Sequence, residues 1–119
     1  MSNDDKLPNK AIPTVDELPK TARKHGLLTC TSHRDIEPIE VVESVVLGAD
    51  AQFSTVVIAD LDLSPQHARV WRAAGGAFLL EDLGSAAGTF VNEMSVQRRT
   101  LMLGDRIRLG AHLVFEFTF

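Results

Sequence analysis

The sequence contains only one cysteine, Cys30, so no disulfide can form within the chain. Small extracellular domains commonly depend on disulfides, and their absence here favours a reducing compartment, which we take to be the cytoplasm. No run of apolar residues approaches the roughly 18 that are needed to cross a bilayer. The first residues, MSNDDKLPNK, lack the apolar core of a secretory signal. We therefore expect no insertion into a membrane.

Lysine is missing from most of the chain, because all four lysines lie within the first 24 residues. From Gly26 onward, seven arginines oppose twelve aspartates and glutamates, which gives a formal net charge of −5. Nucleic acids and anionic membranes are attracted by a positive field. We therefore expect no nucleic-acid partner, and a site for an anion would have to be local.

The 119 residues suit a single domain with a leader in front of it. Residues 1–25 contain Pro8, Pro13 and Pro19, together with mixed charges and no sustained hydrophobic period. Such a segment buries too little apolar surface to offset the entropy of ordering it. We predict a disordered N-terminal leader over 1–25 and one folded domain over 26–119.

Short runs of β-type residues, separated by turn residues, fill the predicted domain. The last run, HLVFEFTF, alternates between Phe115, Phe117 and Phe119 on one side and Glu116 and Thr118 on the other, as in a half-buried strand. Strand-breaking residues cluster at about the 8–12-residue spacing of an all-β fold, at 74–76, 84–88 and 103–105. This pattern predicts an all-β sandwich of short, mostly antiparallel strands.

Four motifs follow one another along this β-type sequence. The first, VVLGAD, is an apolar strand that ends in glycine, and the second, LSPQHARV, places Ser64 three residues before a histidine at a strand entry. The third is the glycine-rich loop of LEDLGSAAGTFVN, and the fourth is the turn of LMLGDRIRLG. The positions of these motifs that we expect to be structural are Gly48, His67, Gly88, Gly104 and Asp105.

In this order and at this spacing, the motifs resemble the forkhead-associated (FHA) domain family over about residues 44–118. The resemblance implies a β-sandwich of about eleven strands that binds phosphothreonine peptides through loops at one end. It implies no catalysis and no cofactor. A phosphothreonine carries nearly two negative charges and three acceptor oxygens. Its binding therefore needs an arginine, hydroxyl and N–H donors, and an amide that holds the peptide backbone.

Several of the family's ligand-binding positions are changed in this sequence. Ala49 stands where the family has its phosphate-binding arginine, and Ala87 stands where it has the asparagine that orients the peptide. Pro65 and Glu93 also replace an arginine and a glycine of the family pattern, whereas Ser64 matches it. We predict a loop face for a ligand or partner that consists of Ala49, Ser64, Pro65, Gln66, Ser85, Ala86, Ala87, Thr89 and Asn92.

Our leading hypothesis is a non-catalytic module that binds a protein partner independently of phosphorylation. Its contacts would come from the loops around 49–54, 63–67 and 84–89, from a face of the sandwich or from an exposed sheet edge. FHA-like domains without the phosphate ligands occur in bacterial secretion machines and signalling scaffolds, so the resemblance implies such an assembly by analogy. The alternative is residual phosphothreonine binding through Ser64, Thr89 and a substitute cation from Arg34, Arg69 or Arg72.

Other chemistries have weaker support in the sequence. Ser64 and His67 could form a nucleophile and base, but no third group marks an orienting partner. Cys30 and His33 have the spacing of half a zinc site, and no second pair follows. We therefore expect neither an enzyme nor a metal site.

Three smaller expectations concern single residues. Thr14 or Thr21 in the leader could be phosphorylated and then bind to the domain itself. The main hypothesis is that the leader is an unstructured linker without this role. We expect Trp71 in the core or at the rim of the sandwich. Arg98 and Arg99 are typical of a solvated loop, with a partner contact as the alternative.

Overall fold

The computed structural model describes residues 25–59 and 62–119. This part of the chain forms eleven strands in two sheets, and all but one of the strand pairs are antiparallel. The predicted all-β sandwich of about eleven short strands is therefore confirmed. The leader predicted over 1–25 lies outside the described residues, apart from His25. No helix in the described part of the chain is long and apolar enough to cross a membrane.

One sheet has six strands in the order β2–β1–β11–β10–β7–β8. Their bounds are β1 Gly26–Cys30, β2 Ile39–Val41, β7 Thr89–Val91, β8 Met94–Ser95, β10 Arg106–Leu109 and β11 Leu113–Thr118. The other sheet has five strands in the order β4–β3–β5–β6–β9. Their bounds are β3 Ser44–Gly48, β4 Val56–Val57, β5 Ala68–Arg72, β6 Phe78–Asp82 and β9 Arg98–Thr100.

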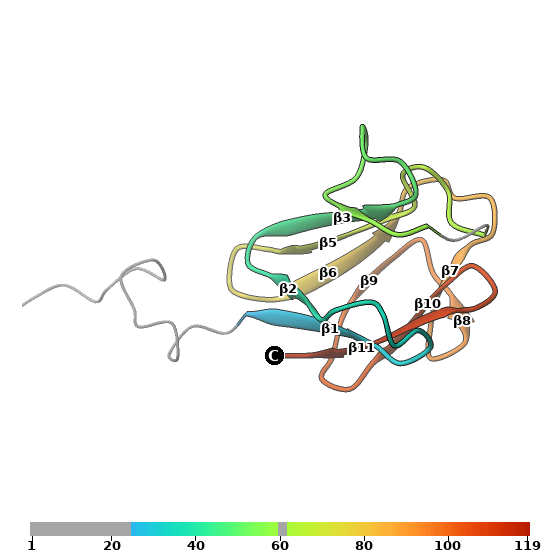
Figure 1. Cartoon of the computed structure of the whole chain (residues 1–119). Helices are drawn as coiled ribbons and strands as arrows, with labels where there is room; N and C mark the ends of the chain where they lie inside the picture. The colour runs from blue at the N-terminus through green and yellow to red at the C-terminus, as the bar shows by residue number, and fades with distance from the viewer. Residues whose placement is uncertain (1–24, 60–61) are drawn as a thin grey trace, which may run out of the picture.

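The two sheets lie face to face, and the connections gather at the two ends of the sandwich (Figure 1). The start of β1 and the C-terminus lie at the left end of Figure 1. The loops that follow β3, precede β5 and join β6 to β7 meet at the upper right. We call this the loop end. The rest of the sandwich positions these three loops on one rigid support.

The core lies between the sheets and is built from alternate residues of each strand. Phe115 and Phe117 of β11 are fully buried, and the ring of Phe117 lies 5.4 Å from the ring of Phe78 in the opposite sheet. The alternation predicted for the last run therefore holds for these two phenylalanines. Phe119 lies beyond β11 and is 49% exposed, but its ring still packs 6.5 Å from that of Phe78.

Two expectations for single residues need correction or refinement. Arg98 and Arg99 lie in strand β9 and pair with β6, so the expectation of a loop is wrong, although Arg98 is exposed to solvent as expected. Trp71 lies half-buried on β5, with the guanidinium of Arg69 4.0 Å from its ring centre and that of Arg98 5.5 Å away. Since the inward positions of β5 are Ala68 and Val70, Trp71 is on the outer face of its sheet.

Candidate functional site

The loop after β3 is fixed against the segment before β5 by a very close backbone approach. A Cβ placed on Gly48 would lie 2.1 Å from the carbonyl oxygen of Pro65 and 2.2 Å from Oγ of Ser54. The same carbonyl accepts hydrogen bonds from the Ser54 hydroxyl (2.7 Å) and from the N–H of Asp50 (3.2 Å). The N–H of Ala49 donates to the carbonyl of Ser64 (3.0 Å). Only glycine allows the two segments to lie this close.

His67 connects the segment before β5 to the loop between β6 and β7. The side chain is fully buried, and its Nδ1 accepts the backbone N–H of Ser64 at 3.2 Å. We therefore assign the proton to Nε2, which donates to the carbonyl of Gly88 at 2.9 Å. Because Nδ1 is occupied by a backbone N–H, it is not positioned to remove the proton of the Ser64 hydroxyl. The geometry favours a positioning role for His67 over that of a catalytic base.

Asp82 at the end of β6 shapes the loop of residues 83–88 from within. One carboxylate oxygen accepts the N–H groups of Gly84 and Ser85 at 3.1 Å each. The other accepts the hydroxyls of Ser85 and Thr89, the latter at 2.7 Å. Burial by itself would raise the pKa of Asp82, but these hydrogen bonds outweigh it and hold the pKa below its ordinary value.

The Ser85 hydroxyl also accepts the N–H of Gly88 at 3.0 Å, which closes the loop on itself. Gly84 and Gly88 have φ angles of +78° and +91°, a region that glycine adopts without strain. The N–H of Ala86 donates to Oγ of Ser64 at 3.0 Å and ties this loop to its neighbour. The methyl groups of Ala86 and Ala87 are left facing solvent.

The structure brings most of the predicted loop face together. The exposed members have small or neutral side chains. Two further members are half-buried, and their hydroxyl groups form hydrogen bonds within and between the loops. Ala49, Pro65, Gln66, Ala86 and Ala87 are exposed, Ser64 and Ser85 are half-buried, and Thr89 is buried. The predicted face is therefore a preformed, uncharged surface supported by hydrogen bonds beneath it.

Asn92 does not join the other members of the loop face. It follows β7, one strand length from Thr89, in the turn to β8. Its amide nitrogen donates to Asp105 at 3.0 Å, and its amide oxygen accepts the N–H of Arg106 at 3.0 Å. Asp105 in turn accepts the N–H of Met102 at 2.8 Å. Asn92 and Asp105 thus connect the turn after β7 to the turn before β10. Both turns lie at the end of β7 that is away from Gly88.

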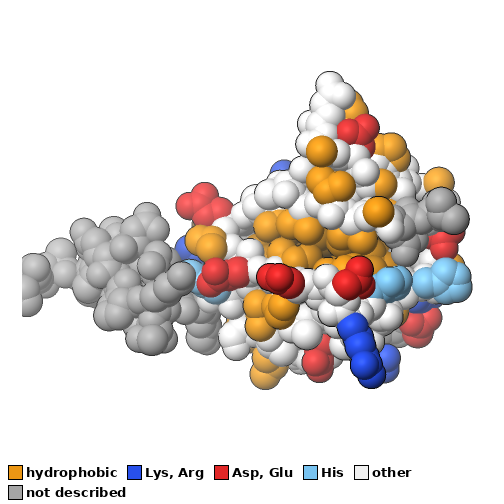
Figure 2. Space-filling model, in the orientation of Figure 1, with side chains coloured by type: hydrophobic (Ala, Val, Ile, Leu, Met, Phe, Trp, Pro, Cys, Tyr) orange, Lys and Arg blue, Asp and Glu red, His pale blue; other side chains and the backbone are white. Residues whose placement is uncertain are grey.

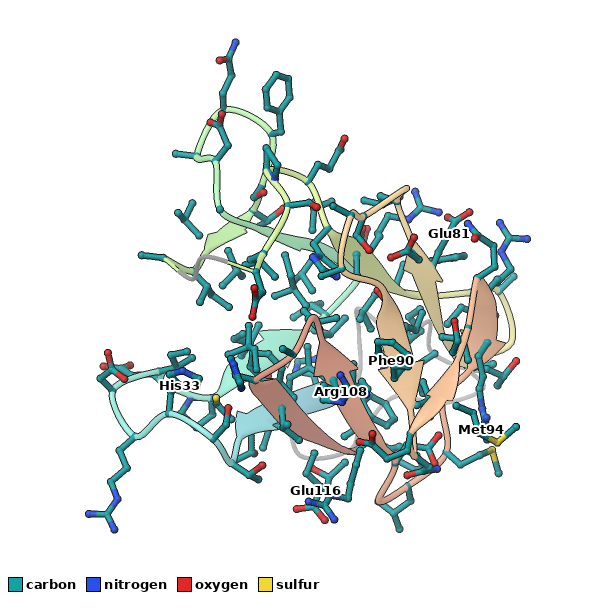
Figure 3. The ribbon with its side chains drawn as sticks, turned by 90° about the vertical axis from the view of Figure 1, so that its right-hand side faces the viewer. His33, Glu81, Phe90, Met94, Arg108 and Glu116 are labelled. Atoms are coloured by element: carbon teal, nitrogen blue, oxygen red, sulfur yellow. The ribbon has the colours of Figure 1, made fainter. Side chains whose placement is uncertain are left out.

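The three arginines considered as substitute cations lie away from Ser64. Arg69 is on the outer face of β5, where it lies 3.8 Å from Glu81. Arg72 is at the other end of β5, next to the turn at 73–76. Arg34 is exposed in the segment that carries His33, which projects to one side in Figure 3, a view onto the loop end.

Arg108, which the sequence analysis did not consider, is linked to the 83–88 loop more directly. Its guanidinium donates to the carbonyl of Gly110 at 2.5 Å, and the N–H of Gly110 donates to the carbonyl of Gly88 at 2.9 Å. It also lies 4.1 Å over the ring of Phe90 (Figure 3) and donates to both carboxylate oxygens of Glu93. Its charge is therefore already balanced by a carboxylate.

Comparison with known proteins identifies the family. The family model described as the FHA domain matches residues 45–110, which is more than half of the chain and includes all three loops. The chain belongs to the FHA domain family. FHA domains are protein-interaction modules and are generally not enzymes.

Individual relatives support the same assignment. The FHA domain is 38% identical over 63 residues to the glycogen accumulation regulator GarA of Mycolicibacterium smegmatis, a match that covers 52% of this chain and 39% of that protein. The FHA domain of FhaA, solved in complex with the intracellular domain of Rv3910, is 30% identical, with a TM-score of 0.68 and coverage of 77% of this chain and 98% of that one. A structure from an analysis of phosphothreonine-dependent FHA domain interactions is 27% identical, with a TM-score of 0.72. The match covers 81% of this chain and 97% of that one.

Sequence analysis missed Asp82, although a local signal for it exists. An aspartate followed two and three residues later by Gly84 and Ser85 is the pattern of a side chain that hydrogen-bonds the backbone N–H groups ahead of it. Cys30 and His33, which have the spacing of half a zinc site, both lie in the described part of the chain. Among residues 25–59 and 62–119, no three histidine, cysteine, aspartate or glutamate side chains converge as a metal ion would require.

Proposed function

We propose that this FHA domain binds a protein partner without needing a phosphate on it, as part of a signalling or secretion assembly. The observation that supports this most is the exposed part of the loop face, which is preformed but uncharged. At the position of the family's phosphate-binding arginine stands Ala49, and the two side chains at the tip of the 83–88 loop are methyl groups. The exposed side chains of the loop face therefore include no cation that could bind a phosphate.

The energetic argument follows from the charge of the ligand. Hydrogen bonds to a charged group contribute roughly 1.5–3 kcal/mol each, and an arginine bound through both nitrogens makes two. Absence of this arginine and of the orienting amide is worth on the order of 3–6 kcal/mol, or 10²- to 10⁴-fold in affinity. The domain's net negative charge opposes the entry of a dianion further. Binding of phosphate alone would therefore be weak.

A second candidate function, residual phosphothreonine binding, is favoured by one observation. The Ser64 hydroxyl accepts a hydrogen bond from Ala86, so its own hydrogen is not used in that contact and can be donated to a ligand. A relative of 27% identity comes from a study of phosphothreonine-dependent interactions. This candidate function still needs a cation to bind the phosphate. Arg108 could supply it only by giving up its hydrogen bonds to Glu93.

The two candidates predict different outcomes in one titration. We would record backbone amide NMR shifts of the full chain with a degenerate phosphothreonine peptide pool and with its unphosphorylated twin. We expect neither pool to shift the amides of Ala49, Ser64 and residues 85–89. Shifts that appear only with the phosphorylated pool and vanish in Ser64→Ala would establish the second candidate instead.

The partner itself is tested by copurification. A protein that copurifies with the full chain from cell extract is expected to stay bound after phosphatase treatment and to bind the Ser64→Ala variant equally well. Release by phosphatase would contradict the proposal. A role of this kind is compatible with a cytoplasmic, reducing setting, in which Cys30 remains a thiol.

A further inference from the structure

A groove with an aliphatic floor and a polar rim runs along the side of the sandwich where both sheets end in an edge strand. It has a volume of about 470 Å³ and lies between β4 and the segment 33–39, which leads into β2. In Figure 2 its floor forms an orange area below the projecting segment 49–55. We call it the edge groove, and its lining residues are His33, Asp35, Ile36, Glu37, Ile39, Val56, Val57, Ile58 and Ala59.

Aliphatic side chains from both sides of the sandwich form the floor of the edge groove. Val56 lies in β4 and Ile58 directly follows it, whereas Ile39 begins β2 and Ile36 lies in the segment before it. Val57 is 49% exposed, whereas Ile39 and Ile58 are buried at the base. The exposed side chain of Val57 gives another chain an aliphatic contact beside this floor.

The rim of the edge groove is acidic. Asp35 and Glu37 line it and are exposed, and Figure 2 shows acidic side chains in a row along its lower border, over β2 and the segment before it. The segment 33–39 contains one arginine, the exposed Arg34, and the two carboxylates of Asp35 and Glu37. The charge of the rim therefore complements a basic segment and repels an acidic one.

The two strands that flank the edge groove also have open sides. β4 pairs only with β3 and β2 pairs only with β1 in the described sheets. Edge strands present backbone N–H and C=O groups on the side away from their partner, which is the template that an extended peptide uses. Side chains of an extended peptide alternate between two directions, so apolar residues can enter the groove while the others face its rim.

We propose that the edge groove binds an extended segment of a partner protein in which aliphatic residues alternate with lysine or arginine. This inference rests on the proposed function and assigns it a surface, because recognition by aliphatic contact and by a carboxylate rim requires no phosphate. It places the contact on the side of the sandwich, at a sheet edge, rather than on the loop face.

The test uses the full chain and a defined probe. The probe is the peptide Lys-Val-Lys-Val-Lys-Val-Lys, blocked at both ends, and its two controls are the glutamate analogue Glu-Val-Glu-Val-Glu-Val-Glu and the block peptide Lys-Lys-Val-Val-Val-Lys-Lys. We expect the alternating lysine peptide to shift the backbone amides of Ile36, Val57 and Ile58. The glutamate analogue should shift none of them, and the block peptide should bind about tenfold more weakly.

Matched variants separate the aliphatic contact at Val57 from the charge of the rim. Val57→Ser should weaken binding of the alternating peptide about tenfold, whereas Met94→Ser, at a 63% exposed site on β8, should leave it unchanged. Asp35→Asn combined with Glu37→Gln should weaken binding severalfold and reduce its salt dependence. Glu116→Gln, an exposed position on the outer face of β11, is the control for that change. Circular dichroism of each variant checks that the fold is intact.

Several outcomes would overturn the assignment. Shifts spread over all acidic surfaces, or equal binding of the block peptide, would indicate only non-specific charge attraction. Shifts in residues 1–24 on addition of the peptide would mean that the chain's own N-terminal segment occupies the groove. If a phosphatase-resistant partner binds Val57→Ser as tightly as the original chain, the proposed function stands and the edge groove is not its site. If phosphatase releases the partner, the proposed function fails independently of the groove.

Discussion

At the residue scale, Gly48 is the glycine at which an added Cβ would meet its neighbours most closely. Here a missing side chain, rather than an unusual φ angle, allows β3 to lie against Pro65. Gly48→Ala would force its new methyl group against the carbonyl of Pro65. We expect a loss of about 3 kcal/mol in the free energy of unfolding, as for an overpacked core, measured by urea denaturation.

The control for this prediction is Gly75→Ala. Nothing lies within 4 Å of a Cβ at Gly75, but its φ of +95° is unfavourable for alanine. We therefore expect only backbone strain, about 1–2 kcal/mol. Equal effects of the two substitutions would contradict the steric explanation for Gly48.

Asp82 links the loop geometry to pH. Burial of its carboxyl is outweighed by hydrogen bonds from Ser85, Thr89 and Gly84, so its pKa in the folded state lies below the ordinary value of 3.8. The unfolded state therefore binds the proton more readily. The stabilisation is present above about pH 4 and is lost as the pH falls through the folded pKa.

The measurement for Asp82 is the free energy of unfolding between pH 6 and pH 2 in the original chain and in Asp82→Asn. We expect the variant to be less stable at pH 6 and to lose less stability than the original chain on acidification. Parallel curves for the two proteins would mean that Asp82 does not carry this pH dependence.

Ala49 and Ala87 offer a gain-of-function test. If these alanines replace the family's arginine and asparagine, the double substitution Ala49→Arg and Ala87→Asn should increase affinity for phosphothreonine peptides at least tenfold, since each charged hydrogen bond contributes about 1.5–3 kcal/mol. Fluorescence anisotropy with matched phosphorylated and unphosphorylated peptides measures it. Ala51→Arg, an exposed position in the same loop, is the control for charge alone.

At the scale of elements, the turn between β7 and β8 has two residues in the left-handed region. Asn92 has a φ of +51° and Glu93 a φ of +69°. Asparagine tolerates this conformation. The nitrogen of its side-chain amide donates to Asp105, and the oxygen accepts the N–H of Arg106. Asn92→Ala should cost about 2 kcal/mol of folding free energy through strain and lost hydrogen bonds.

Asn92→Gly separates these two contributions. It relieves the strain but loses the hydrogen bonds to Asp105 and Arg106, so we expect a smaller loss of about 1 kcal/mol. Thermal denaturation of both variants under one condition gives the comparison. A glycine variant as unstable as the alanine variant would assign the whole effect to the hydrogen bonds.

Not every element could be predicted from the sequence. The last strand alternates over enough residues to show a period of two, and its buried phenylalanines follow that period. β9, Arg98–Thr100, contains three polar residues in a row, so no alternation marks it as a strand. It exists because β6 offers it a hydrogen-bonding edge. Very short strands are specified by their neighbours more than by their own residues.

At the scale of the whole molecule, the two sheets are joined by aromatic contacts at the end away from the loops. Phe117 of β11 is fully buried against Phe78 of β6, whereas Phe119 packs on the same ring from a half-exposed position. Phe117→Ala should reduce the free energy of unfolding by about 4 kcal/mol because it leaves a cavity between the sheets.

Phe119→Ala is the matched comparison, and we expect a loss well below that of Phe117→Ala, about 1 kcal/mol, because half of its side chain already contacts water. Urea denaturation of both variants measures the difference. Similar losses would show that the end of the chain contributes as much to the core as β11 does.

The sequence by itself determined the fold class, the family and the position of the loop motifs. These depend on local features, namely alternation in β11, strand-breaking glycines, and the order of Gly48, Ser64, His67 and Gly88. Each of these features depends on a few neighbouring residues, so hydrophobic periodicity and turn-forming residues are enough to predict it.

Only the tertiary structure decided what the loops contact and where the exposed apolar surface lies. His67 connects Ser64 to Gly88, and Asn92 lies away from the face for which it was predicted. The edge groove combines Ile36, from the segment before β2, with Val57 of β4. Contacts between residues distant in sequence arise from strand order and register, and a single sequence contains no local pattern that specifies either.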